Sequence, residues 1–373
     1  MAFILGIESS CDETAAAVLK DGKQVLSNCV SSQIAQHAPF GGVVPELAAR
    51  EHLRNIQPVV SQALKDASLS VADLDAVAVT NGPGLLPALV VGVNFAKALA
   101  YINHKPIIGI NHFLAHIYGA FLEDNTQLLS DPATFPIAAL VVSGGHTSIV
   151  IIQSDGKAEV VGSTLDDAAG EAFDKAAKLL DLGYPGGPII EESALKGNAL
   201  AFNFPRPLTG TAGKALKSKH KFDFSFSGLK TSLLYHCRKQ GLIDYDANMT
   251  GNVSVCSNES SDLLYDTIAS YQEAIIDVLA NKFSNAIQEF NVATAVLCGG
   301  VACNNALRIR ITEFVQDKLN VNLLLASPKF CTDNAAMIAG LGYHYYQASL
   351  FDDECLDAFS RLPSQNMSIP LSL

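Results

Sequence analysis

Two stretches of the chain, ILGIESSCDETAAAV at residues 4–18 and AALVVSGGHTSIVII at residues 138–152, decide the fold class that the sequence predicts. Each is an apolar run, a small polar loop rich in Ser, Gly and Thr, and a second apolar run, which is the pattern of a β-hairpin. The two stretches begin about 134 residues apart, and a duplicated unit repeats its order of elements. The sequence therefore predicts two similar lobes with one hairpin each.

A strand, a glycine-rich turn and a helix follow one another at two further places. Residues 73–102 contain a strand, a turn at 81–84 and a helix, and residues 295–308 repeat that order. This is the basic α/β unit. Further helices are expected after residue 111, over about 166–180 and from about 331. We therefore expect an α/β fold in which each lobe is a mixed sheet flanked by helices.

Length and charge limit the class of protein. At 373 residues the chain exceeds one ordinary domain. It shows neither a leader pattern nor an apolar run of about 18–20 residues, so a cytoplasmic protein with no membrane contact is expected. The net charge of −12 disfavours binding to nucleic acid without a partner. Residues 206–230 form one basic and aromatic tract, which is either an RNA contact or a solvated loop over core phenylalanines.

The eight cysteines are scattered without a CxxC pair, which fits a reducing compartment better than a disulfide framework. Cys298, Cys303 and Cys331 lie near the glycine-rich turn and the start of the last helix. Their simplest interpretation is that of small core side chains.

The segment Asn-His-Phe-Leu-Ala-His at 111–116 places His112 and His116 on one face of a helix, a spacing that suits one metal ion. Phe113 stands where the zinc proteases of this spacing carry a catalytic Glu, so a protease would lack its base. Asp333 is the candidate third ligand, and the alternative is that it caps a helix. Two histidines and one carboxylate leave coordination positions open for a substrate, and iron and zinc both fit.

Two glycine-containing loops could hold an anion. Residues 143–146, Ser-Gly-Gly-His, offer a hydroxyl and consecutive amides that could wrap a phosphate, and the alternative is a plain hairpin turn. The turn at Gly299 and Gly300 would let a ligand approach the backbone closely beside Asn304.

Acidic side chains cluster in the first hairpin loop and in the helix expected over 166–180. Glu8, Asp12 and Glu13 could position a nucleophile or bind a cation in a cleft, and on a surface they would simply be solvated. In the second cluster Asp174 is the candidate for a functional role.

Seven motifs spread over residues 4–342 together resemble the universal tRNA N6-adenosine threonylcarbamoyltransferase family of bacterial type: ESSCDET, NHFLAH, VVSGGHT, AFDKAAKLL, YPGGP, FSFSGLKT and CGGVACN. The whole pattern is also similar to the actin, hexokinase and heat-shock ATPase (ASKHA) superfamily, whose two lobes bind a nucleotide in the cleft between them. The resemblance implies that lobe I comprises 1–110 plus about 335–360. Lobe II would comprise 111–334, with a largely helical insertion at about 160–290.

The resemblance also implies roles for individual residues. The metal ligands of the family match His112, His116 and Asp333. Acids that the family needs for activity match Asp12 and Glu13, which would orient or deprotonate the acceptor amine. The contacts to the threonylcarbamoyl-adenylate would come from Val141, Val142, Ser143, Gly144, Gly145, His146, Asp174, Gly187, Glu191 and Asn304.

By the same resemblance, the enzyme transfers a threonylcarbamoyl group from its adenylate to the exocyclic amine of the adenosine just 3′ of the anticodon. The acceptors would be tRNAs that read codons starting with A. One divalent metal ion, Fe²⁺ or Zn²⁺ with Mg²⁺ as an alternative, would be the cofactor, and the cleft could take an ATP- or ADP-like ligand. The implied partners are tRNA, an inactive paralogue of the same fold, a small ATPase and an upstream synthase that forms the adenylate.

The chain departs from the family pattern in its length around residues 241–262 and in its tail, in Cys303 where Ala or Ser is usual, and in Glu191 where Asp is usual. Three rival functions stay open. A small-molecule kinase or ATPase of the same fold would not need the histidine pair, a metallo-endopeptidase would need a Glu at residue 113, and a non-catalytic scaffold would not need the metal ligands.

Overall fold

The structure is a computed structural model and describes residues 1–209, 220–244, 254–255, 261–361 and 367–371. Of the basic tract predicted over 206–230, residues 210–219 lie outside this part of the chain, as does most of the segment 241–262. No helix among the described residues is both long and apolar enough to cross a membrane.

The first sheet is built around the N-terminal hairpin. Its five strands, in spatial order, are β3 (Gln24–Ser32), β2 (Glu13–Lys20), β1 (Phe3–Glu8), β4 (Ala76–Gly82) and β5 (Ile107–Asn111). Strand β1 runs antiparallel to β2 and parallel to β4, and β5 continues parallel to β4. The sheet is therefore mixed, with the hairpin loop and the ends of β4 and β5 at one edge.

Helices cover both faces of this sheet because side chains alternate along its strands. Leu5 and Ile7 of β1 belong to a core with α2 (Pro45–Asp66) and α3 (Leu86–Ile102). Ile4 belongs to a second core, which includes side chains of α4 (His112–Gly119) and α11 (Ala336–Gln347).

The second sheet is built around the second hairpin. Its six strands, in spatial order, are β12 (Asn322–Leu325), β11 (Thr294–Cys298), β6 (Ile137–Val142), β7 (Thr147–Ile152), β8 (Lys157–Ser163) and β13 (Met367–Ser368). Strand β6 pairs antiparallel with β7 and parallel with β11. The prediction of two hairpins, and of two mixed sheets flanked by helices, is confirmed.

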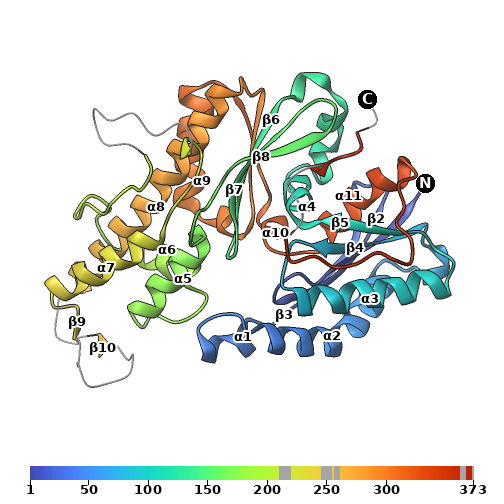
Figure 1. Cartoon of the computed structure of the whole chain (residues 1–373), viewed down its shortest axis with the longest axis horizontal. Coiled ribbons are helices and arrows are strands. Elements are labelled where there is room, and N and C mark those ends of the chain that lie inside the picture. Colours follow the sequence, from blue (N-terminus) through green and yellow to red (C-terminus); the bar gives the residue numbers. More distant parts are fainter. Residues whose placement is uncertain (210–219, 245–253, 256–260, 362–366, 372–373) are drawn as a thin grey trace.

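Most of the remaining helices belong to the side of the second sheet (Figure 1). They are α5 (Ala169–Leu179), α6 (Gly186–Ala194), α7 (Ser227–Lys239), α8 (Ser261–Glu289) and α9 (Asn305–Thr312). Two one-turn helices, α1 (Ile34–His37) and α10 (Pro328–Cys331), and the antiparallel pair of β9 (Ile243–Asp244) with β10 (Ser254–Val255) complete the described α-helices and strands. The lobe boundaries expected from the sequence stay a prediction.

Two helix starts differ from the predicted ones. The helix expected from about 166 begins at Ala169, because Asp166 instead accepts hydrogen bonds from Phe226 and Ser227 at the start of α7. The last helix begins at Ala336, so Asp333 lies in the turn between α10 and α11.

Strand β1 and helix α11 approach each other closely at Gly6. A Cβ atom at this position would lie 2.3 Å from the carbonyl oxygen of Ala335 and 2.6 Å from the amide nitrogen of Ala339. Only a residue without a side chain fits between a strand and a helix backbone at such distances. The absence of a side chain at residue 6 therefore sets where α11, and the turn that precedes it, lie on the first sheet.

We predict that Gly6→Ala lowers the free energy of unfolding by about 2 kcal/mol, because the added methyl group must push α11 away from β1. Gly228→Ala is the matched control, since a Cβ at this exposed helical position meets nothing within 4 Å. It should change the stability by less than about 1 kcal/mol, in the stabilising direction. Urea unfolding of both variants checks this, and equal midpoints would contradict the close approach at Gly6.

Candidate active site

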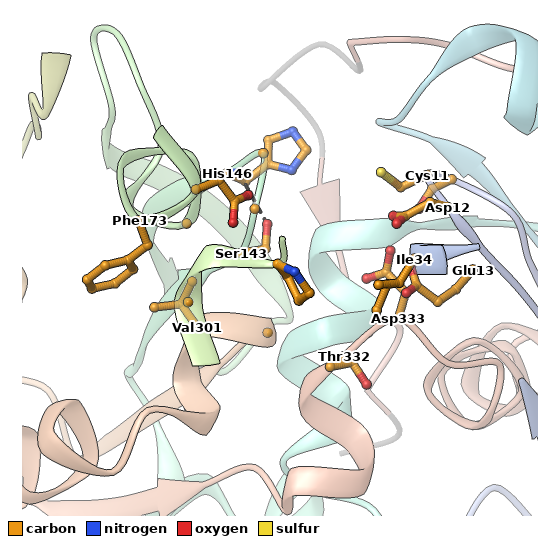
Figure 2. A pocket seen from close by; sticks show the side chains of 18 of the residues that line it. Cys11, Asp12, Glu13, Ile34, Ser143, His146, Phe173, Val301, Thr332 and Asp333 are labelled. Carbon is orange, nitrogen blue, oxygen red and sulfur yellow. Dashed lines mark hydrogen bonds between the residues drawn. The ribbon is translucent and has the colours of Figure 1, made fainter. Parts of the chain in front are cut away.

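One cavity of about 570 Å³ lies between the two hairpin loops. The loop at residues 10–13 and the turn at 83–85 line it on the side of the first sheet. The loop at 143–146, the start of α6 and the turn at 300–304 line it on the other side. Figure 2 shows Asp12 and Glu13 on one side of this space and Ser143 and His146 on the other.

The structure gathers most of the residues that the sequence singled out around this one cavity. His116 does not line it, because it is buried behind His112. Val141 and Val142 do not line it either, because they are fully buried in the interior strand β6, which ends where the loop begins. The candidates that line the cavity are Asp12, Glu13, His112, Ser143, Gly144, Gly145, His146, Asp174, Gly187, Glu191, Asn304 and Asp333.

His112, His116 and Asp333 form the group that could hold a metal ion among the described residues. Asp333 Oδ1 lies 3.1 Å from His116 Nε2 and 3.6 Å from His112 Nε2. The alternative role of Asp333 as a helix cap is wrong, since the amide of Met337 in the first turn of α11 donates to the side chain of Asn334 instead. The side chain of Asn111 caps α4 and so fixes the start of the helix that carries both histidines.

The donor set fits a divalent cation. Glu8 Oε2 lies 3.1 Å from His112 Nδ1, so Nδ1 donates to Glu8 and Nε2, on the side of Asp333, is the nitrogen that would bind a cation. Two ligand atoms bound to one ion at about 2.0–2.2 Å lie roughly 3–3.5 Å apart. The distances from Asp333 Oδ1 to the two imidazoles are close to this range, and ligand atoms of all three side chains lie within 4.8 Å of one another, so the group could hold a cation.

The charges of this cluster depend on one another. Burial alone would lower the pKa of His112, but the carboxylates of Glu8 and Asp333 raise it to about 9. Burial would raise the pKa of Asp333, and attraction to His112 and His116 instead holds it well below its usual value. Without a cation the cluster therefore keeps a proton on His112, and a divalent ion would replace that proton as the source of positive charge. Burial, and then repulsion from the two histidines, lowers the pKa of His146 to about 4, so its ring is neutral.

Asp12 and Glu13 share a hydrogen bond at the edge of the cavity. Burial raises the pKa of Glu13 to about 9, and the charges of Asp333 and Asp12 contribute to the rise. Glu13 therefore holds a proton at neutral pH and donates it toward Asp12. Asp12 lines the cavity beside Glu13, where its side chain could accept a hydrogen bond from a substrate.

A buried histidine that the sequence gave no reason to select holds this acidic loop. The ring of His52, on α2, donates through Nε2 to the carbonyl oxygen of Cys11 at 3.0 Å and accepts through Nδ1 from the hydroxyl of Thr14 at 2.8 Å. Both bonds join α2 to the loop that carries Asp12. A lone histidine on an amphipathic helix gives no local signal for such a role.

Three of the predicted substrate contacts also form hydrogen bonds with backbone amides on the side of the cavity that belongs to the second sheet. Asp174 Oδ1 accepts from the amide of Gly186 at 2.7 Å, and Glu191 Oε1 accepts from the amide of Asn305 at 2.7 Å. Asn304 accepts from the amide of Leu307 and donates to Gln272. These bonds fix the starts of α6 and α9 beside the cavity, where the positive ends of the helix dipoles favour an anion.

Tyr184 lies among acids that come from both sides of the cavity. Burial raises the pKa of its hydroxyl, and Asp12 from the first sheet and Asp174 from α5 raise it further. The motif YPGGP contains this residue, but the sequence alone gave it no role. The sequence selected Glu8 only as one of the acids of the hairpin loop, and its contact with His112 could not be foreseen because it spans 104 residues of chain.

We predict that Glu8→Gln weakens the binding of a divalent metal ion about 10- to 100-fold, because the hydrogen bond that orients and polarises His112 loses its charge. Competition of the metal-free protein with a chromophoric chelator for Zn²⁺ measures this. Glu46→Gln, at an exposed position of α2, is the matched control. Equal affinities for both variants, with unchanged circular dichroism, would show that Glu8 has no part in the metal site.

Comparison with known sequences gives one consistent result. The profile of the family described as TsaD, tRNA N6-adenosine threonylcarbamoyltransferase, matches residues 24–340. The chain is 45% identical over 360 residues to the tRNA N6-adenosine threonylcarbamoyltransferase of Syntrophus aciditrophicus, with 96% of this chain and 97% of that protein covered. It is also 45% identical to the enzyme of that name from Thermosipho africanus, with 96% and 99% covered.

Comparison with solved structures shows the fold. Full-length HypF in its phosphate- and nucleotide-bound form matches with a TM-score of 0.57 at 13% identity, over 94% of this chain and 47% of that chain. HypF of T. kodakarensis matches with a TM-score of 0.55 at 16% identity, over 95% of this chain and 48% of that chain. These likenesses agree with the expected α/β fold of two mixed sheets flanked by helices.

Proposed function

Since this chain belongs to the tRNA N6-adenosine threonylcarbamoyltransferase family and is therefore a transferase, we propose that it transfers a threonylcarbamoyl group from threonylcarbamoyl-adenylate to N6 of the adenosine 3′ of the anticodon. The acceptors are tRNAs that read codons starting with A. The observation that carries this proposal is the single cavity in which a His-His-Asp centre, a glycine loop and a carboxylate pair meet.

The glycine loop suits the phosphate of the adenylate. Gly144 and Gly145 are exposed and a Cβ at either would meet nothing within 4 Å, so a ligand can approach the backbone closely at these two residues. Gly170 packs against Ser143 and Gly144 so closely that an added Cβ would lie 2.6 Å from the carbonyl oxygen of Ser143. The loop is therefore held in place from behind, as a preorganised anion site requires.

His112, His116 and Asp333 would hold the metal ion next to this loop. Fe²⁺ and Zn²⁺ suit two imidazoles and a carboxylate, whereas Mg²⁺ prefers a shell of oxygen atoms. When bound, the ion supplies positive charge that stabilises the negative oxygens of the departing AMP. Glu8 keeps His112 in the tautomer that this requires.

The acidic pair suits the acceptor amine. The N6 nitrogen attacks the carbamoyl carbon, the bond from that carbon to the phosphate oxygen breaks, and AMP leaves. Asp12 accepts a hydrogen bond from the amine and takes its proton, while the protonated Glu13 holds Asp12 in place. The weak nucleophile is brought to the donor by this orientation.

The proposal includes the partners that the resemblance implied: tRNA, an inactive paralogue, a small ATPase and an upstream synthase, in the cytoplasm. The exposed apolar side chains of Leu53 on α2 and of Leu86 and Val90 on α3 would suit a protein partner. In the basic tract, Arg206 is paired with Asp277 and Lys221 with Glu289. A tRNA contact there would have to compete with these ion pairs or use charges of the partner subunits.

Nothing at the site favours the rival functions. A metallo-endopeptidase would need a carboxylate at residue 113, and the ring of Phe113 instead packs against the ring of His146, with centroids 4.5 Å apart. The membership of the chain in a transferase family disfavours a small-molecule kinase and a non-catalytic scaffold.

We predict that His112→Ala reduces tRNA modification at least about 100-fold, because the metal ion loses an imidazole ligand whose two ring nitrogens face Glu8 and Asp333. The assay supplies ATP, bicarbonate, labelled threonine, tRNA, the adenylate-forming enzyme and the partner subunits, and the digested tRNA is searched for the modified nucleoside by mass spectrometry. The matched control is His104→Asn, at an exposed left-handed position that asparagine tolerates. It should retain full activity.

Two outcomes would contradict the proposal. Unchanged modification by His112→Ala would mean that the chain acts as a scaffold for another catalyst. Label that accumulates only in small molecules and never enters the tRNA would mean that the chain does not carry out the proposed transfer.

A further inference from the structure

The chain beyond the last helix returns to the cavity along the first sheet. The backbone of Asp352 pairs with the edge strand β5, and its carboxylate accepts from the amide of Gly109 at 2.7 Å. Further along, the amide of Phe359 donates to the carbonyl oxygen of Asn81 in β4 at 2.8 Å. Residues 352–361 therefore run beside the first sheet toward the end of β4, and we call them the C-terminal strap.

Buried contacts hold the strap in this path. Leu356 and Ala358 are both buried and belong to the core on the α3 side of the sheet. Nζ of Lys97, on α3, donates to the carbonyl oxygen of Leu356 at 3.0 Å. A Cβ at Gly109 would lie 2.7 Å from Leu356 Cδ1, so this leucine fits against β5 because residue 109 has no side chain. The packing of the first sheet therefore sets where the strap ends.

The strap ends at the rim of the cavity. Ser360 lines the cavity on the side of the turn at 83–85, which follows β4, and the next residue, Arg361, is exposed. Arg361 forms no ion pair with any other residue that the structure describes, whereas Arg206 and Lys221 of the basic tract are both paired. Its guanidinium is therefore a positive charge that the described part of the chain leaves available to a ligand.

This charge matters because the cavity is acidic. Among the described residues that line it there is no lysine and no arginine, whereas the carboxyl groups are those of Asp12, Glu13, Asp174, Glu191 and Asp333. The His-His-Asp centre and the glycine loop would serve the phosphate of the adenylate. A phosphate of the acceptor RNA, which would enter on the side of Asp12, needs a separate cation there to offset the acids.

We propose that Arg361 binds a phosphate group of the acceptor RNA next to the reacting nucleotide, and that the C-terminal strap holds it at the rim for this purpose. The inference rests on the proposed function, in which the RNA enters on the side of Asp12. A guanidinium suits this ligand because its N–H groups can pair with two phosphate oxygens at once. The place of the strap on the first sheet, across the cavity from the loop at 143–146, favours the RNA over the adenylate as the source of the phosphate.

Binding of tRNA to the full-length protein with its partner subunits tests the proposal. Arg361→Glu should raise the dissociation constant for tRNA at least about tenfold at low salt. Arg361→Ala should reduce the slope of log affinity against log salt concentration by about 1. Arg361→Lys keeps the charge and should bind within about threefold of the wild type.

The matched control is Lys23→Glu, which makes the same change of charge. Lys23 is exposed in the turn between β2 and β3, at the end of the sheet opposite the loop that carries Asp12. This variant should bind tRNA as the wild type does. A loss of affinity equal to that of Arg361→Glu would show that only the net charge of the protein matters, and would overturn the proposal.

Transfer kinetics separate the two sources of phosphate. In Arg361→Glu the KM for tRNA should rise at least about tenfold, while the KM for threonylcarbamoyl-adenylate keeps its wild-type value. A rise in the KM for the adenylate alone would assign the arginine to the donor and overturn the proposal, as would a wild-type affinity for tRNA. If the wild type bound tRNA in an arginine-dependent way but transferred no group to it, the proposed function would fail and the phosphate contact would stand.

Discussion

The buried carboxylate of Glu8 is the constraint on which the site depends. It ends β1 with no exposure to solvent, and a charge in such a place persists only when it is paired and hydrogen-bonded. It accepts from the amide of Ser10 at 2.5 Å, from the hydroxyl of Thr80 at 2.5 Å and from the ring of His112 at 3.1 Å. One side chain therefore ties together the first hairpin loop, the end of β4 and the start of α4, which are the elements that carry the acids and the metal ligands.

A second constraint brings the last ligand to this point. Helix α11 packs on β1 at Gly6, where the two backbones touch, and the turn before α11 then places Asp333 beside His116. The candidate metal site is therefore formed by the packing of the last helix on the first strand. A shift of α11 would change the distance from Asp333 to the two histidines, because Asp333 lies in the turn that leads into this helix.

The two sides of the cavity divide the chemistry between them. The first hairpin provides a shared proton on Glu13 and a carboxylate on Asp12, and the second provides exposed backbone at Gly144 and Gly145. Acids suit an acceptor amine and amides suit a phosphate, so the donor and the acceptor would meet between loops of opposite electrostatic character. Both loops join antiparallel strands of an interior hairpin, which holds them more firmly than a surface loop would be held.

The sequence by itself determined the features that depend on local spacing. Alternating apolar runs around small polar loops gave both hairpins, and a four-residue interval placed His112 and His116 on one helical face. Most of the residues that it selected line the cavity, because they lie in loops and turns. It could not show that Val141 and Val142 are enclosed within β6, since the exact end of a strand depends on its neighbours.

Only the tertiary structure decided which distant residues meet. Asp333 contacts His116 across 217 residues of chain, Glu8 orients His112, and His52 holds the acidic loop through bonds that no local pattern indicates. The same is true of Asp174 and Glu191, whose carboxylates fix helix starts. The physical reason is that hydrogen bonds and charges act over a few ångströms of space, whereas sequence periodicity reports only the face on which a side chain lies.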